Sequence, residues 1–105
     1  MYRNEKGVVM FEFEINRLQD CIDKLKQEGR YDDAKMEQIK VNVYKHTMEV
    51  KLYTDKASID LKDQLIDIRH SWEEALKIAE SFDDEDKAMA ERVKIETINH
   101  ILERI

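Results

Sequence analysis

The sequence contains no proline, two glycines and one cysteine among its 105 residues. Because the many turns of a β-sandwich or β-barrel depend on glycine and proline, their scarcity argues against such folds. A lone cysteine excludes an intramolecular disulfide framework and a cysteine-based zinc site. A chain of this length has the size of one domain. We therefore expect a single helical domain over residues 1–105.

Long apolar runs are also missing. The longest is Val8-Val9-Met10-Phe11, which is far too short to cross a membrane, and no signal-peptide pattern opens the chain. These observations predict a soluble, cytoplasmic protein.

The charge of the sequence is unbalanced in one segment only. The chain holds 24 acidic and 18 basic residues, a net charge of −6, which disfavours direct binding to nucleic acid or to an anionic membrane. Residues 57–86 hold ten acidic and three basic side chains, a net charge of −7, whereas the other stretches are close to neutral. The excess negative charge is therefore a local property.

Apolar residues recur every three or four positions, which is the spacing of one face of an α-helix. This periodicity predicts helices over roughly 8–28, 31–55, 58–81 and 85–104, and hence an all-α fold, an antiparallel bundle of about four helices. The stripes expected to form the core are Val8, Phe11, Ile15, Leu18, Ile22 and Leu25; Met36, Ile39, Val43, His46, Val50 and Tyr53; Leu61, Leu65, Ile68, Trp72, Ala75, Ala79 and Phe82; and Ala88, Ile95, Ile98, Leu102 and Ile105. Because His46 stands among core positions, we expect its imidazole to be buried and hydrogen-bonded.

Local signals mark several helix ends. Gly29 suits the left-handed residue that ends a helix. Asp32 or Asp33 is placed to accept hydrogen bonds from the first amides of the second helix, and Ser58 to cap the third. Because residues 54–58 contain no glycine or proline, the alternative is that the second and third helices form one long kinked helix.

The second segment carries apolar residues on two sides. At about 100° per residue, the side opposite Ile39 and Val50 presents a second stripe. This stripe consists of Val41, Tyr44, Met48 and Leu52. Either the helix is central in its own fold, or another molecule covers its second face. Because two-fold homodimers are the commonest soluble oligomers, we predict that these four residues form a homodimer interface.

The third segment presents an acidic face opposite its apolar stripe. The expected partner-binding residues, including two in the turn after the helix, are Ile59, Asp63, Ile66, Asp67, His70, Glu74, Asp83 and Asp84. Carboxylates around two β-branched apolar residues fit a basic groove on a protein, and complementary charge speeds and orients such an encounter. The alternative is a solvated helix face, with the acids of residues 83–86 stabilising the positive end of the next helix.

Motifs for catalysis or cofactor binding are missing. Asp67 and His70 have the spacing of part of a di-iron site, and Glu96 and His100 are spaced i,i+4, but neither pair faces the expected core. The acids of residues 57–86 only partly resemble the carboxylate clusters of helical, magnesium-dependent nucleotide pyrophosphatases. No phosphate-binding loop or serine nucleophile motif is present. We expect no catalytic residue, no cofactor and no metal.

These observations predict a non-enzymatic, protein-binding regulatory protein that acts through its acidic third helix. Its concrete form is a small acidic inhibitor of a nucleic-acid-binding enzyme, of the phage anti-defence type, whose carboxylates take the place of phosphates. The alternative is a self-assembling helical scaffold or adaptor. A magnesium-dependent hydrolase ranks below both.

Overall fold

The computed structural model describes residues 2–105, with side chains from residue 10 onward. Its helices are α1 (Tyr2–Gln27), α2 (Tyr31–Ala57), α3 (Leu61–Ser81) and α4 (Glu85–Arg104). No strand occurs within residues 2–105, so the predicted all-α fold with four helices is confirmed. The expected core position Val8 lies outside the residues whose side chains are described.

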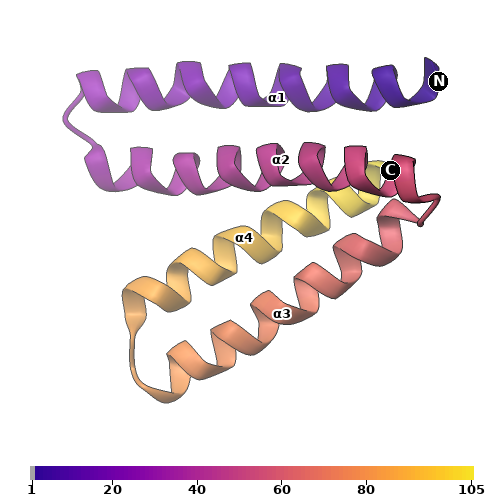
Figure 1. Ribbon diagram of the computed structural model, residues 1–105. Helices are drawn as coiled ribbons and strands as arrows, with labels where there is room; N and C mark the ends of the chain where they lie inside the picture. Colours follow the sequence, from indigo (N-terminus) through magenta and orange to yellow (C-terminus); the bar gives the residue numbers. More distant parts are fainter. Residues whose placement is uncertain (1) are drawn as a thin grey trace.

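The four helices form two hairpins that cross each other (Figure 1). The chain reverses direction between α1 and α2 and again between α3 and α4. The first hairpin meets the second through α2, which packs against both α3 and α4, whereas the described backbone of α1 approaches α2 alone. Helix α2 is therefore the central element of the fold.

The turn between α1 and α2 is a helix-ending glycine turn. Gly29 has a φ of +75°, as predicted, and the next amide, that of Arg30, donates to the carbonyl of Leu25 at 2.8 Å. The prediction that Asp32 or Asp33 caps α2 is wrong. Arg30 occupies the N-cap without a side-chain cap hydrogen bond, and its guanidinium pairs with the Asp33 carboxylate at 2.7 Å.

The join between α2 and α3 is a short connection, residues 58–60, and not a continuous helix. Ser58 was expected to cap α3, but it ends α2 in the left-handed conformation, with a φ of 56°. The cap of α3 is Asp60, whose side chain accepts from the amide of Asp63 at 3.2 Å. Asp84 caps α4 in the same way through the amide of Lys87.

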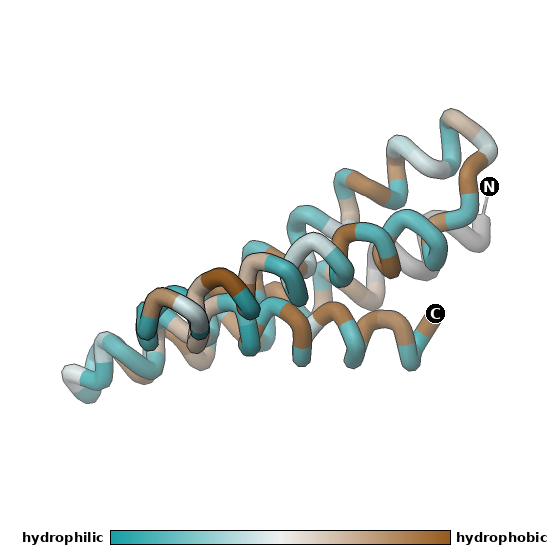
Figure 2. Tube along the Cα trace, turned by 90° about the horizontal axis from the view of Figure 1, so that it is seen from below, coloured by the Kyte–Doolittle hydropathy of each residue, from teal (hydrophilic) through white to brown (hydrophobic). Residues whose placement is uncertain are grey.

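The core contains most of the predicted stripe of α1 but a shifted set on α2. Figure 2 shows hydrophobic and hydrophilic positions alternating along the helices. The buried apolar side chains are Phe11, Leu18 and Ile22 of α1, Ala34, Val41, Val43 and Tyr44 of α2, Leu65 and Ala79 of α3, and Ala88, Ile98 and Ile101 of α4. On α2 the buried positions also include Thr47 and Thr54.

Four expected core residues are exposed instead: His46, Tyr53, Phe82 and Ile105. Helix α2 is covered on two flanks, so its buried side includes Tyr44 and Thr47 instead of following the predicted stripe. His46 and Tyr53 lie on the side of α2 that faces solvent. Phe82 and Ile105 follow the last residues of α3 and α4, at positions that no neighbouring helix covers.

Candidate functional site

The acidic face predicted from the sequence lies on the solvent side of α3. Its six helix-proximal members, Ile59, Asp63, Ile66, Asp67, His70 and Glu74, are all exposed. The opposite side of α3 carries Leu65, which is buried, and Trp72, which packs against the core. Asp83 and Asp84 are also exposed, but they lie in the turn at the far end of α3. The structure thus separates the predicted set into a helix face and a turn.

Several acidic side chains near this face have partners within the chain. Glu74 pairs with Lys77 at 3.5 Å, Glu80 with Arg92 at 3.0 Å, and Asp84 caps α4. Among the residues whose side chains are described, Asp63 and Asp67 make no side-chain hydrogen bond or ion pair. These two carboxylates remain available to another molecule.

The apolar members of the face are partly exposed to solvent. Ile59 is 39% exposed and Ile66 is 41% exposed. Removing apolar surface from water is favourable by a free energy of about 25 cal/mol per Å², which these side chains do not gain while they are exposed. A partner that covers Ile59 and Ile66 recovers this gain.

The predicted dimer residues of α2 are mostly covered by their own chain. Val41 and Tyr44 are buried, Met48 packs against the core, and only Leu52 is exposed. The Tyr44 ring lies 6.1 Å from that of Phe11 on α1. The second apolar stripe is thus explained by the central position of α2, which removes the reason for placing a homodimer interface there.

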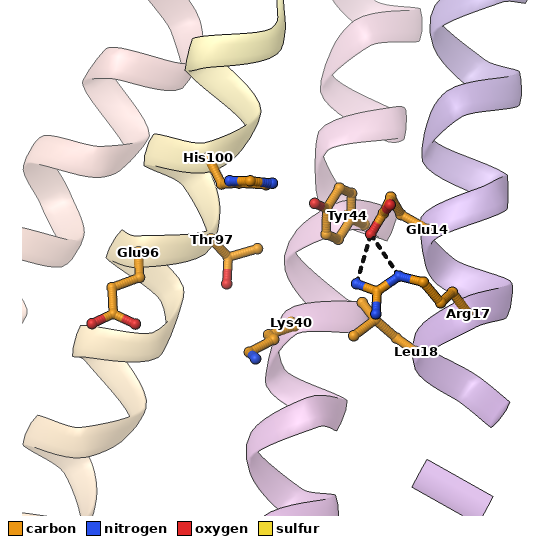
Figure 3. Close-up of a pocket in the computed structure, with 8 residues that line it drawn as sticks. All are labelled: Glu14, Arg17, Leu18, Lys40, Tyr44, Glu96, Thr97 and His100. Atoms are coloured by element: carbon orange, nitrogen blue, oxygen red, sulfur yellow. Dashed lines mark hydrogen bonds and ion pairs between the residues drawn. The ribbon is translucent and has the colours of Figure 1, made fainter. Parts of the chain in front are cut away.

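A groove that the sequence did not reveal lies where α1, α2 and α4 meet (Figure 3). Its volume is about 260 Å³. Its walls are formed by Glu14, Arg17 and Leu18 of α1, Lys40 and Tyr44 of α2, and Glu96, Thr97 and His100 of α4. The Glu14 carboxylate accepts from Arg17 at 2.9 Å and lies 3.7 Å from the Arg104 guanidinium, so it connects α1 with α4.

The charges around this groove perturb the ionisation of its members. The hydrogen bond from Arg17 is the main reason that the pKa of Glu14 lies below its ordinary value; partial burial opposes this effect, and the charges of Arg17 and Arg104 add to it. Burial raises the pKa of the Tyr44 hydroxyl, and the nearby Glu14 carboxylate adds to this effect. The positive groups of the groove already neutralise the partly buried carboxylate of Glu14, so these ion pairs hold α1 and α4 together.

Glu14 therefore makes stability depend on pH in a defined direction. Because its folded pKa is below the ordinary value of 4.5, its stabilising effect is complete above that value and is lost as the pH falls through the folded pKa. We expect Glu14→Gln to lower the free energy of unfolding by about 1 kcal/mol at neutral pH and to have almost no effect in strong acid.

Urea unfolding followed by circular dichroism across the acidic range tests this expectation. The matched control is Glu12→Gln, because Glu12 is exposed on the same helix and should leave stability near that of the wild type. A Glu14→Gln penalty that grows towards low pH would contradict the assignment.

One buried acidic residue was not predicted from the sequence. Glu91 of α4 is buried; its Oε1 accepts from Lys94 at 3.1 Å, while its Oε2 has no hydrogen-bond partner. The Lys94 ammonium lies 5.6 Å from the centre of the Trp72 ring. The signal was present in the spacing, because Glu91 follows Ala88 by three residues and precedes Ile95 by four.

The described residues offer no site for a metal or a membrane span. No group of three His, Cys, Asp or Glu side chains is close enough to hold a metal ion within the described part of the chain. No helix over residues 2–105 is both long and apolar enough to span a bilayer. In comparisons with protein-family models, with curated proteins and with solved structures, nothing matches this chain.

Proposed function

We propose that this protein is a non-enzymatic regulatory protein that binds a basic protein surface through the outer face of α3. The observation that carries the proposal is the pair of carboxylates without intramolecular partners, Asp63 and Asp67, beside the exposed side chains of Ile59 and Ile66. Interfaces commonly combine an apolar centre with polar, charged surroundings, and this face has both elements.

The spacing on the helix brings these groups onto one surface. Asp63 and Asp67 are four residues apart, about 6 Å along the helix axis, and Glu74 continues the same side two turns later. Although α2 and α4 both pack against α3, the members of this face are exposed, so a partner can approach it without disturbing the fold. Charge complementarity then favours a partner rich in lysine or arginine.

The concrete form of the proposal is inhibition of a nucleic-acid-binding enzyme. The groove of such an enzyme is positively charged because it binds phosphates. A helix that carries a row of carboxylates competes for the same cations without being a substrate. The local net charge of −7 over residues 57–86 supports this class of partner over a neutral one.

Charge reversal on α3 tests the proposal. The variant Asp63→Lys/Asp67→Lys/Glu74→Lys is compared with wild type in affinity capture from the native host, followed by binding measurements with each purified captured protein. We expect the variant to bind a basic, nucleic-acid-binding partner at least about tenfold more weakly, a loss of about 1.4 kcal/mol. Wild-type binding should also weaken as salt is raised.

The matched control places the same change of charge on α1. Glu12→Lys/Asp20→Lys/Asp23→Lys alters three exposed acids outside the α3 face and should keep the partner. Equal binding by the α3 variant and wild type would refute the proposal, as would equal losses in both triple variants, which would indicate a nonspecific effect of net charge.

A further inference from the structure

The connection between the two hairpins contains a residue in an unfavourable backbone conformation. Ser58, at the end of α2, has a φ of 56° and a ψ of 40°, the left-handed region that only glycine adopts without a steric penalty. The amides of Ser58 and Ile59 both donate to the carbonyl of Thr54. The chain thus reverses here in three residues, 58–60, without glycine or proline.

The surrounding sequence is compatible with an uninterrupted helix. Gly29 is the last glycine of the chain, and there is no proline at all, so residues 30–105 contain neither of the strong helix breakers. Asp60 is extended, with a ψ of 123°; if residues 58–60 all adopt right-handed helical angles, α2 and α3 become one helix over residues 31–81. Such a helix relieves the strain at Ser58.

The buried threonines of α2 show that the apolar stripe keeps its register through the connection. Thr47 and Thr54 are buried together with Val43, and the next core residues along the chain are Leu61 and Leu65. From Thr54 to Leu61 is seven residues, the repeat of a helix face over two turns. A continuous helix therefore presents the inward sides of α2 and α3 on one common face.

The interface between the hairpins has an apolar part, and it also includes the charged groove where α1, α2 and α4 meet. It joins the buried side of α2 to core residues such as Leu65, Ile98 and Ile101. Among the described side chains, the ion pair that spans the hairpins is Glu14 with Arg104. A second copy of the chain offers the same surface, with the same contacts.

We propose that the chain forms a two-fold dimer by exchanging hairpins with a second copy of itself. In this dimer α2 and α3 of each chain merge at Ser58, and the α1–α2 hairpin of one copy packs on the α3–α4 hairpin of the other. The two long helices run in opposite directions and cross each other, which preserves the oblique crossing of α2 and α3 (Figure 1). The symmetry is closed, and the assembly ends at two chains.

The exchange costs little because every contact between hairpins is remade. The gain is relief of the left-handed conformation at two hinges, and short hinges under strain are known to favour exchange. The cost is the entropy of association, so the dimer fraction rises with protein concentration during refolding. This proposal does not rest on the function proposed for α3, although the two share Ile59, which lies in the connection 58–60 and also belongs to the acidic face.

Hinge variants test the proposal through the mass of the refolded protein. Wild type is unfolded, refolded at about 1 mM and at about 1 µM chain, and analysed by size exclusion with light scattering. We expect dimer only at the higher concentration. Glycine adopts the left-handed conformation of the monomer without a steric penalty, so Ser58→Gly removes the strain that favours exchange. We expect this variant to raise the dissociation constant of the dimer at least about tenfold, because the strain is removed at both hinges.

The chain offers a matched control at the other hairpin. Asp83, in the turn between α3 and α4, is the second non-glycine residue with a positive φ, at 54°. Asp83→Gly relieves comparable strain outside the proposed hinge and should leave the dissociation constant unchanged. Insertion of Gly-Ser-Gly after Ser58 relaxes the hinge in a second way and should abolish the dimer.

Spin labels show whether the hinge has opened. Labels on Glu49→Cys and His70→Cys, in a Cys21→Ala background diluted with unlabelled chain, lie on two exposed positions either side of Ser58. In a merged helix they are separated by about 32 Å along the axis, at about 1.5 Å per residue, whereas the closed chain folds them back towards each other. Three results overturn the proposal: a monomer at every concentration, a dimer indifferent to Ser58→Gly, or a dimer that keeps the closed-chain distance.

Discussion

Replacing Phe11 with alanine is expected to lower the free energy of unfolding by about 3–5 kcal/mol. Phe11 is 1% exposed, and its ring lies 6.1 Å from that of Tyr44 at an angle of 55°. Because the described backbone of α1 packs on α2 alone, few other contacts can compensate for the cavity. Urea denaturation followed by circular dichroism measures the loss.

Phe13 provides the matched control for this prediction. It stands two residues later on the same helix, on the opposite side, and is 70% exposed. Phe13→Ala removes the same atoms from a solvated position and should change the free energy of unfolding by less than about 0.5 kcal/mol. Similar losses in the two variants would contradict the described packing of α1.

The contrast between Phe11 and Phe13 also shows which part of the fold can be predicted from sequence. A helix with one neighbour buries one stripe, and on α1 the three-four spacing identified Phe11, Leu18 and Ile22 correctly. The predicted bounds of α4 and the predicted end of α3 at residue 81 agree with the structure for a similar reason, whereas the start of α3 was predicted at residue 58, three residues before Leu61. Their caps and stripes act locally, before tertiary contacts matter.

Helix α2 could not be predicted in the same way, because it is covered on two flanks. Which residues of α2 are buried depends on the angle at which the second hairpin crosses it. The spacing of apolar residues in the sequence does not determine this angle. His46 was therefore expected inside and is exposed, while Thr47 is buried. A threonine can enter an apolar core when its hydroxyl donates to its own helix, as Thr47 does to the Val43 carbonyl at 2.8 Å.

The candidate functional residues also include some that could be predicted from the sequence and some that could not. Exposure of the acidic side of α3 follows from amphipathic spacing, so its residues could be named in advance. The groove beside Glu14 and the buried Glu91 depend on how α4 meets the other helices. Glu91 interrupts an otherwise apolar stripe, and an acid at such a position is a usable signal of a buried ion pair.

Replacing Leu65 with alanine is expected to lower the free energy of unfolding by about 2–5 kcal/mol. Leu65 has no exposed surface, and it belongs to the core that joins α3 to α2 and α4. The cavity therefore weakens the contact between the two hairpins as well as α3 itself. Thermal and urea unfolding should both report the loss, with a slope of the urea transition close to that of wild type.

Ile66 is the neighbouring control, and it also separates stability from binding. At 41% exposure, Ile66→Ala should cost well under half of the Leu65→Ala penalty, because much of its side chain already contacts water. Under the proposed function, the loss of partner binding should follow the opposite order to the loss of stability, since Ile66 lies on the acidic face and Leu65 does not. At temperatures where both variants are folded, Ile66→Ala should bind the basic partner more weakly than Leu65→Ala. The reverse order would show that α3 contributes packing but not a binding surface.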